Sequence, residues 1–152
     1  MIIKKHCLII GAMKSGTTSL YCTIKESQNI DSSMYKDTKF FIDKNCGGNW
    51  QKGISWYQQQ FSDNGIINLE ASTHYSKLPD YTCVANRILK TLKDVKFIYL
   101  FRNPIDRAIS HFFHNRIVDK ESIDINSAFS NVNSKYYHYS NYSKQITPYS
   151  NR

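Results

Sequence analysis

Residues 7–26 constrain the fold more than any other stretch of this chain. The apolar run Cys7–Ile10 is followed by a loop between Gly11 and Gly16, and a segment with helical spacing of apolar residues comes next. A loop at the start of a helix attracts anions, because its free N–H groups point outward and the helix dipole adds about half a positive charge. The two glycines let the backbone approach such an anion closely. The sequence therefore predicts a buried strand, an anion-binding loop and a helix that ends near residue 26.

The loop departs from the P-loop of nucleoside triphosphate-binding proteins at one position. A Walker A loop has the pattern G-x-x-x-x-G-K-[ST], whereas Thr17 follows the second glycine here and the lysine of the loop is Lys14. A lysine inside the loop is placed to contact the bridge of a shorter group, such as a 5′-phosphosulfate. An ordinary strand-to-helix turn with a solvated lysine is the alternative, which the coincidence of glycines, lysine and hydroxyls disfavours. The predicted donors to the anion are Ser15, Gly16, Thr17 and Thr18.

The charge balance also favours an anionic ligand. The chain has 152 residues, with 20 Lys+Arg against 12 Asp+Glu, and a formal net charge of +8. The positive residues are scattered, so we expect no nucleic-acid partner. The four cysteines show no C-x-x-C spacing, and we expect no metal site. Nothing resembles a signal peptide or a transmembrane span, which favours a cytoplasmic protein.

Residues 11–20, Gly-Ala-Met-Lys-Ser-Gly-Thr-Thr-Ser-Leu, resemble a known anion-binding loop. It is the 5′-phosphosulfate loop of the sulfotransferases that use 3′-phosphoadenosine-5′-phosphosulfate, in particular of bacterial and heparan-sulfate-type members. The resemblance implies that this nucleotide is the co-substrate, with no metal. It also implies that Lys14 binds the bridging oxygen while Ser15, Gly16, Thr17 and Thr18 cradle the 5′-phosphate.

A second motif follows the apolar run of residues 95–101. Arg102-Asn103-Pro104 opens a predicted helix, with Asn103 as its N-cap and Pro104 at its first position. Residues 102–110 resemble the family signature Arg-x-Pro-x-x-Arg-x-x-Ser, which holds the 3′-phosphate of the nucleotide. Arg102 offers a fork of donors, and Ser110 lies about two helical turns further along. The resemblance therefore assigns both residues to the 3′-phosphate.

The candidate general base is Asp37. Lys36-Asp37-Thr38-Lys39-Phe40-Phe41 resembles the family segment Lys-Glu-x-His-Phe-Phe, whose glutamate takes the proton from the acceptor. Aspartate is one methylene shorter, so its carboxylate reaches about 1–1.5 Å less far. A solvated loop carboxylate paired with Lys36 or Lys39 remains the alternative.

Two further candidates come from residues 69–75, which resemble the family segment Gly-Glu-x-Ser-Pro-x-Tyr. Glu70 is expected either to contact the acceptor or to hold the lysine of the loop. His74 is a second candidate base, with an ordinary exposed loop histidine as the alternative.

The order of elements predicts the fold class. Strands at residues 7–10, 66–70 and 95–101 alternate with helices expected over 17–26, 54–61, 79–93 and from 104, followed by helices over 122–132 and 136–146. This order predicts an α/β fold, P-loop-like, with three α/β/α layers around a parallel sheet. Both phosphate sites are expected at the carboxyl edge of its strands. The resemblance implies that residues 1–152 are the N-terminal two thirds of one sulfotransferase domain, with the C-terminal part missing.

The predicted reaction is transfer of a sulfuryl group to a hydroxyl or amine of a small-molecule or glycan acceptor. A carbohydrate acceptor follows from the resemblance alone. One alternative is a truncated, non-catalytic remnant that binds nucleotide. The other is a P-loop kinase, which is disfavoured by the position of Lys14 and by the absence of an acidic residue where the strand 95–101 ends.

Overall fold

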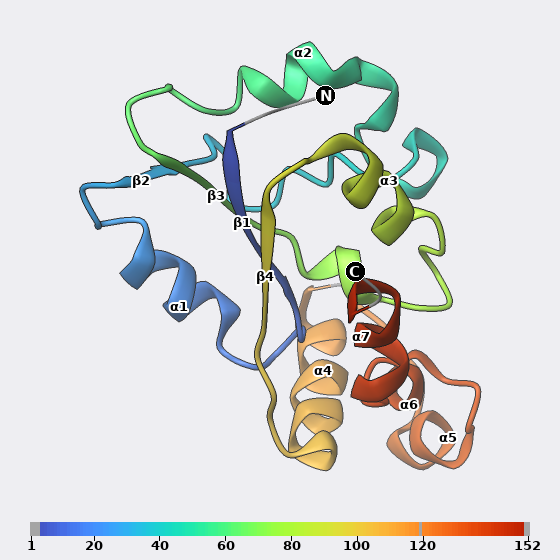
Figure 1. Ribbon diagram of the computed structural model, residues 1–152. Helices are drawn as coiled ribbons and strands as arrows, with labels where there is room; N and C mark the ends of the chain where they lie inside the picture. The colour runs from blue at the N-terminus through green and yellow to red at the C-terminus, as the bar shows by residue number, and fades with distance from the viewer. Residues whose placement is uncertain (1–3, 119, 151–152) are drawn as a thin grey trace.

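The computed structural model describes residues 4–118 and 120–150, and its centre is a four-stranded sheet of order β2-β3-β1-β4 (Figure 1). Each pairing in the sheet is parallel, which confirms the predicted α/β class. Three strands coincide with the predicted apolar runs, and a fourth, β2, was not predicted. The strands are β1 (Lys5–Gly11), β2 (Ile30–Ser32), β3 (Ile67–Ala71) and β4 (Val95–Tyr99).

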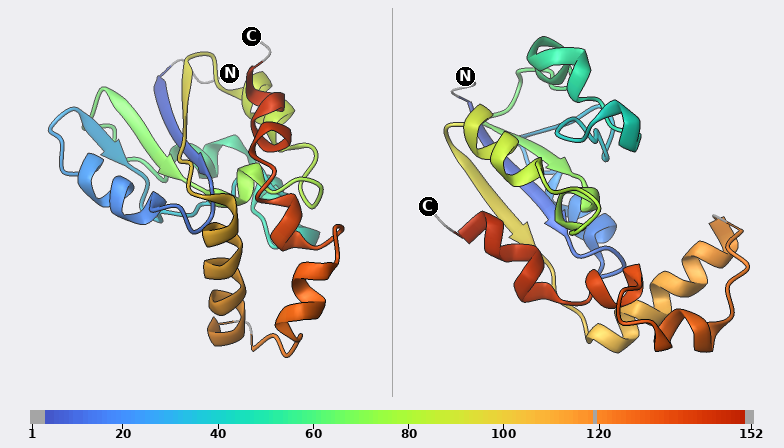
Figure 2. Two further views of the ribbon diagram at one scale, coloured as in Figure 1. Left: turned by 90° about the horizontal axis from the view of Figure 1, so that it is seen from below. Right: turned by 90° about the vertical axis from the view of Figure 1, so that its right-hand side faces the viewer.

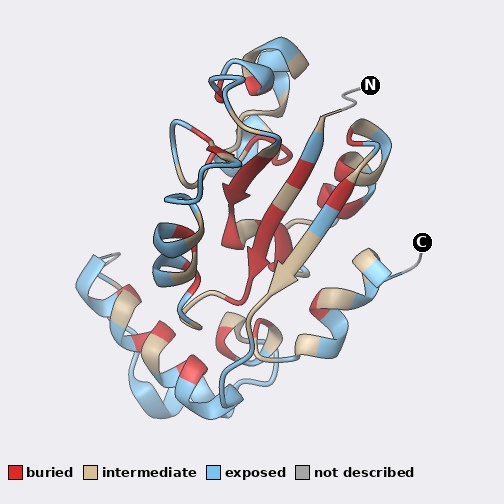
Figure 3. Ribbon diagram, turned by 60° about the vertical axis from the view of Figure 1, so that its left-hand side comes forward, coloured by how far each residue is buried: buried red, intermediate tan, exposed pale blue. Residues whose placement is uncertain are grey.

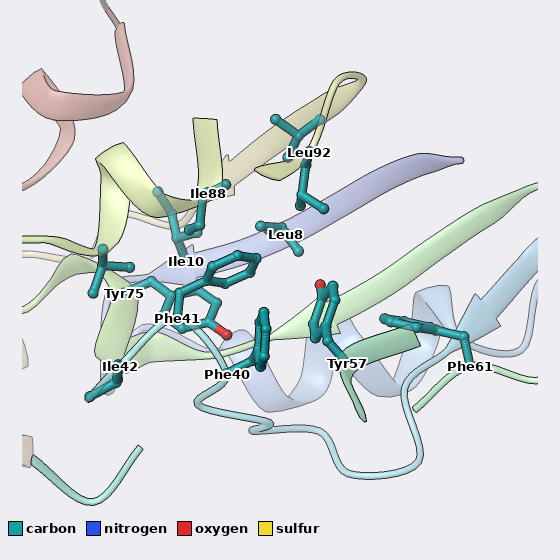
Figure 4. Close-up of a cluster of buried hydrophobic side chains, with 12 residues drawn as sticks. Leu8, Ile10, Phe40, Phe41, Ile42, Tyr57, Phe61, Tyr75, Ile88 and Leu92 are labelled. Carbon is teal, nitrogen blue, oxygen red and sulfur yellow. The ribbon is translucent and has the colours of Figure 1, made fainter. Parts of the chain in front are cut away.

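Helices cover both faces of the sheet, because successive side chains of β1 point to opposite faces. Leu8 belongs to a core cluster with Tyr57 and Ile88 (Figure 4), whereas Ile9 packs with Tyr21 in a second cluster. The predicted three-layer arrangement follows from these two clusters. The helices that supply them are α1 (Thr17–Ile24) on one face and α2 (Gly53–Gln58) and α3 (Val84–Thr91) on the other.

Short 3₁₀ helices connect the layers. They are η1 (Lys44–Cys46), η2 (Trp50–Lys52) and η3 (Thr73–Ser76). The helix predicted to start at Pro79 begins only at Val84, because a turn comes first in which the N–H groups of Asp80 and Tyr81 both donate to the carbonyl of Lys77.

After β4, the helices within residues 104–118 and 125–138 form a helical layer beyond the carboxyl edge of the sheet, and the last helix, residues 142–150, runs back beside α3 and β4 (Figure 2). Asn103 Oδ1 accepts hydrogen bonds from the N–H groups of Ile105 at 3.0 Å and Asp106 at 3.3 Å, which confirms the predicted N-cap. The single helix predicted over 136–146 is wrong, because Asn141 caps a new helix by accepting from the N–H of Lys144. The four helices are α4 (Pro104–Val118), α5 (Ile125–Ser130), α6 (Lys135–His138) and α7 (Tyr142–Ser150).

Buried residues concentrate along the strands, whereas much of the helical layer is exposed (Figure 3). Within the described ranges, no helix combines the length and the apolar character that crossing a membrane requires.

Arg107 of α4 is fully buried and connects α4 to residues 136–140 by hydrogen bonds. Its Nε donates to Ser140 Oγ at 2.8 Å and its Nη2 donates to the carbonyl of Tyr136 at 2.8 Å. Burial lowers the pKa of this guanidinium below its usual value. Buried polar groups need hydrogen-bond partners, and here the Ser140 hydroxyl and the Tyr136 carbonyl supply them.

Replacing Arg107 by methionine is therefore expected to destabilise the fold. The change removes the donors that Ser140 Oγ and the Tyr136 carbonyl accept from, and the expected loss in the free energy of unfolding is about 1–3 kcal/mol. The matched control is Arg116→Met on the same helix, at an exposed position, where we expect a change within about 0.5 kcal/mol. Urea unfolding of both variants measures the difference, and equal stabilities would contradict this role of Arg107.

Candidate functional site

The two predicted phosphate motifs meet because β1 and β4 are neighbours in a parallel sheet. Their pairing continues past the strands: the N–H of Leu100 donates to the carbonyl of Gly11 at 2.8 Å, and the N–H of Ala12 donates to the carbonyl of Leu100 at 3.0 Å. Arg102 then reaches across, and its Nη1 donates to the carbonyl of Lys14 at 3.2 Å. The structure thus brings Arg102 into direct contact with the anion loop.

The loop has the backbone conformation of an anion-binding turn. Lys14 (φ 68°) and Gly16 (φ 88°) are both left-handed, and Gly16 is the N-cap residue of α1 with no side-chain cap. The first N–H groups of a helix lack partners inside the helix, so here they are available to an anion. Gly11 is required at the start of the loop, because an added Cβ would lie 2.2 Å from Ser76 Oγ.

Two cavities adjoin this loop, and Lys14, Thr17 and Thr18 line both of them. The first, which we call the loop cavity, has a volume of about 320 Å³ and is lined by Lys14, Gly16, Thr17, Thr18, Arg102 and Ser110. The second, the histidine cavity, has about 570 Å³ and is lined by those three shared residues together with Met13, Lys36, Asp37, Thr73, His74, Lys77, Asp80, His111, His114, Asn115, Lys135 and Tyr139.

The predicted residues divide between the cavities in a consistent way. Arg102 and Ser110 lie in the loop cavity, whereas Asp37 and His74 lie in the histidine cavity. Ser15 lines neither cavity, and its Oγ is buried without a hydrogen-bond partner among the described residues. A further cavity of about 370 Å³, between α4 and the α5–α6 region, has mainly apolar walls and contains none of the predicted residues.

Asp37 is held by a side chain from the segment after β3. Ser72 Oγ donates to Asp37 Oδ1 at 2.7 Å, and His74 Nδ1 lies 3.5 Å from the same oxygen. Burial raises the pKa of the Asp37 carboxyl, but the contacts with His74 and Ser72 outweigh it and hold this pKa below its usual value. Burial lowers the pKa of His74 below its usual value despite the nearby carboxylate. At neutral pH the site therefore presents an ionised Asp37 beside an uncharged imidazole.

Glu70 lies apart from both cavities. Its side chain is 0% exposed, and its carboxylate accepts hydrogen bonds from Thr38 Oγ1, Tyr75 OH and Tyr57 OH. These three hydroxyls enclose the carboxylate, and it lines neither of the cavities that adjoin the loop lysine. Its position is therefore unlike that of a group that contacts the acceptor or holds Lys14, the two roles expected from the sequence.

Sequence reasoning missed two histidines that line the histidine cavity. They are His111 and His114 of α4. His111 follows Arg107 by four residues, and His114 follows His111 by three. That helical spacing is the signal that would have found them. Burial and the nearby Arg107 lower the pKa of His111 to about 3, so this imidazole is neutral.

On the α6 side of the histidine cavity, Lys135 and Tyr139 each contact an acidic side chain. Lys135 Nζ lies 2.7 Å from Glu121 Oε2, and Tyr139 OH donates to Asp80. In the part of the chain that the structure describes, no group of three His, Cys, Asp or Glu side chains is arranged to hold a metal ion.

Comparison with known families finds a match over nearly the whole chain. The family model described as "Sulfotransferase domain" matches residues 4–152. Among solved structures, the sulfotransferase from Alicyclobacillus acidocaldarius superposes with a TM-score of 0.75 at 22% identity, covering 97% of this chain and 68% of that one. At this identity the superposition supports the fold alone.

Curated relatives include larger proteins. The bifunctional heparan sulfate N-deacetylase/N-sulfotransferase 1 of Xenopus laevis is 33% identical over 131 residues, which are 82% of this chain and 14% of that protein. The human protein of the same name is 31% identical over 121 residues, which are 74% of this chain and 13% of that protein. The membrane-associated sulfotransferase kil1 of Dictyostelium discoideum is 31% identical over 110 residues, which are 69% of this chain and 22% of that protein. The chain thus spans only a small part of the length of these relatives.

Proposed function

The chain belongs to the sulfotransferase domain family, and on that premise we propose that it transfers a sulfuryl group from 3′-phosphoadenosine-5′-phosphosulfate to a hydroxyl or amine. The observation that carries the proposal is that Lys14, Thr17 and Thr18 line both cavities. A donor nucleotide whose phosphates lie in the loop cavity would therefore present its sulfuryl group toward the histidine cavity, where Asp37 lies.

The residues of the loop cavity suit the two phosphates of this donor. The free N–H groups at the start of α1 bind the 5′-phosphate, with the hydroxyls of Thr17 and Thr18 beside them. The orphaned, buried Ser15 Oγ fits a loop that gains a partner when an anion binds. Arg102 and Ser110, which line the same cavity, bind the 3′-phosphate.

The chemistry then needs a proton acceptor and a charge stabiliser. Asp37 takes the proton of the acceptor hydroxyl or amine as its oxygen or nitrogen bonds to sulfur. The bond between sulfur and the bridging oxygen breaks, and Lys14 stabilises the negative charge that develops on the departing 5′-phosphate. The products are the sulfated acceptor and 3′-phosphoadenosine-5′-phosphate.

We propose a carbohydrate acceptor, because some of the relatives are named as heparan sulfate N-sulfotransferases. The four lysines along the histidine cavity, namely Lys14, Lys36, Lys77 and Lys135, are compatible with a polar, hydroxyl-rich acceptor. The domain assignment of residues 1–152 and a cytoplasmic location stay predictions from the sequence.

The competing kinase function is disfavoured by the site. The carboxylate at the end of β3, Glu70, is enclosed by three hydroxyl groups, whereas a kinase needs an acidic side chain that reaches magnesium beside the phosphates. The second alternative, a chain that binds the nucleotide without turning it over, differs from the proposal only in catalysis.

A transfer assay separates these possibilities. The chain is incubated with donor labelled with ³⁵S and with oligosaccharides that carry free hydroxyls or amines. We expect label in the oligosaccharide together with an equal amount of 3′-phosphoadenosine-5′-phosphate. Donor that binds but keeps its label under all these conditions would contradict the transferase and favour the nucleotide-binding remnant.

Replacing Arg102 by alanine is expected to weaken binding of 3′-phosphoadenosine-5′-phosphate selectively. A charge-assisted hydrogen bond contributes about 1.5–3 kcal/mol, so we expect about 10- to 100-fold weaker binding. Binding of 5′-AMP, which lacks the 3′-phosphate, should change little, and Arg102→Lys should fall between because it keeps the charge and loses the fork. Equilibrium dialysis with both nucleotides measures this, and an equal loss for both would contradict the assignment.

A further inference from the structure

The buried carboxylate of Glu70 joins three separate segments of the chain. Tyr57 of α2 donates to its Oε2 at 2.8 Å, Tyr75 of η3 donates to its Oε1 at 2.6 Å, and Thr38 Oγ1 donates to Oε1 as well. Both tyrosine rings belong to the core cluster drawn in Figure 4. Because a buried carboxylate is costly unless its oxygens are satisfied, these hydroxyls and Glu70 fix one another in place.

One of these partners, Thr38, is the direct neighbour of Asp37. Residues 36–39 run beside residues 70–72: the N–H of Ala71 donates to the carbonyl of Lys36 at 3.1 Å, and Ser72 Oγ donates to Asp37 Oδ1 at 2.7 Å. The Thr38–Glu70 hydrogen bond lies on the buried side of this segment, while Asp37 lies on the cavity side. Thr38 is thus the anchor that ties the segment to the core.

We propose that Glu70 is a positioning residue: its buried carboxylate holds Thr38 and thereby directs the neighbouring Asp37 carboxylate into the histidine cavity. Glu70 is 0% exposed and lines neither cavity, so it acts through Thr38 and not on a substrate. The catalytic consequence rests on the proposed function, whereas the placement of Asp37 is measurable without any ligand.

The protonation state of Glu70 makes its hold on Thr38 depend on pH. Burial raises the pKa of Glu70 to about 7, although its hydroxyl partners oppose this shift. Tyr57 and Tyr75 face it with pKa values raised well above their usual range, and Asp37 has a lowered pKa, so Glu70 is the member of these four that changes charge near neutral pH. Ionised Glu70 accepts from all three hydroxyls. As the pH falls through about 7, protonation turns one accepting position into a donor and weakens the hold on Thr38.

The first test is an NMR titration of the ligand-free protein with ¹³C-labelled carboxyl groups. In the wild type we expect the chemical shift of the Asp37 carboxyl carbon to change twice, once at its own pKa and again, in a second step, at the pH where Glu70 titrates. Glu70→Gln removes that step. Thr38→Val reduces it and raises the pKa of Asp37 toward its usual value, because the contacts of Asp37 with Ser72 and His74 loosen. Thr38→Ser, which keeps the hydroxyl, restores both.

The matched control is Tyr57→Phe, which removes the donor to Oε2 and leaves the Thr38 contact in place. We expect the Asp37 step to persist in this variant. Circular dichroism checks that each variant is folded. An Asp37 pKa and second step in Thr38→Val equal to those of the wild type would overturn the proposal.

Kinetics provide the second test. With labelled donor and oligosaccharide acceptor, Thr38→Val and Glu70→Gln should lower kcat by about 10²-fold, as expected for a misplaced catalytic group. The KM for the donor should change less than about twofold, because the loop cavity is untouched. Wild-type protein that transfers no sulfuryl group would refute the proposed function, while the titration still decides the role of Glu70. Full transfer activity in both variants would refute the positioning role alone.

Discussion

Replacing Asp37 by asparagine is expected to lower kcat by about 10²–10⁴-fold, the range for loss of a general base. Asparagine has the same shape and can still accept from Ser72 Oγ, which donates to Asp37 Oδ1 in the native protein. The change therefore removes the charge and proton affinity with little change in packing. Because Asp37 does not line the loop cavity, the affinity for 3′-phosphoadenosine-5′-phosphate should stay the same.

Three further variants test this assignment. Asp63→Asn is the matched control, since the Asp63 side chain is 85% exposed and lies outside both cavities. Asp37→Glu should retain activity, because it keeps a carboxylate with about 1–1.5 Å more reach. If Asp37→Asn stayed within a few-fold of the wild type while His74→Gln lost activity, the base would be His74, the second candidate.

The second large effect concerns Lys14, whose replacement by alanine should lower kcat/KM by about 10²–10³-fold, as for loss of one preorganised donor at a developing oxyanion. Lys14 lines both cavities and so lies at the boundary where the bridging oxygen would sit. Its backbone is left-handed, with φ 68°. Alanine and lysine both carry a Cβ, so the substitution adds no backbone strain and isolates the loss of the ammonium group.

The control for Lys14→Ala is Lys90→Ala, which removes one positive charge from an exposed position on α3 outside both cavities. Rates measured with labelled donor should separate the two variants by at least about tenfold if Lys14 acts locally. Equal rates for Lys14→Ala and Lys90→Ala would show that net charge alone matters and would contradict the mechanism.

The fold was predictable where the signal is local. Three of the four strands carry apolar runs, and Asn103 capped α4 as its sequence position indicates. β2 was missed because it is three residues long and carries a buried aspartate, Asp31. Its carboxylate is paired by Ser62, 31 positions away, and by Lys4, whose Nζ lies 3.5 Å from Oδ2. The break between α6 and α7 was missed because it depends on a single capping side chain, Asn141.

The candidate site divides in the same way. Lys14 and Arg102 were predicted because each belongs to a contiguous motif, and neighbouring parallel strands bring the two motifs together. The environment of Glu70 was not predictable, because Thr38 and Tyr57 reach it from 32 and 13 residues away in the sequence. The pKa and the enclosure of that carboxylate depend on these distant hydroxyls, and no local pattern reveals them.

The most direct test of the account is calorimetric binding of 3′-phosphoadenosine-5′-phosphate, with ATP and 5′-AMP as controls, in the absence of metal. The loop cavity, which is lined by Arg102 and Ser110 together with the start of α1, predicts selective binding of the bisphosphorylated nucleotide. Removing the 3′-phosphate should weaken binding by about 10-fold or more. Tighter binding of ATP that requires magnesium, or no binding of the bisphosphate by the folded chain, would contradict the assignment of this site.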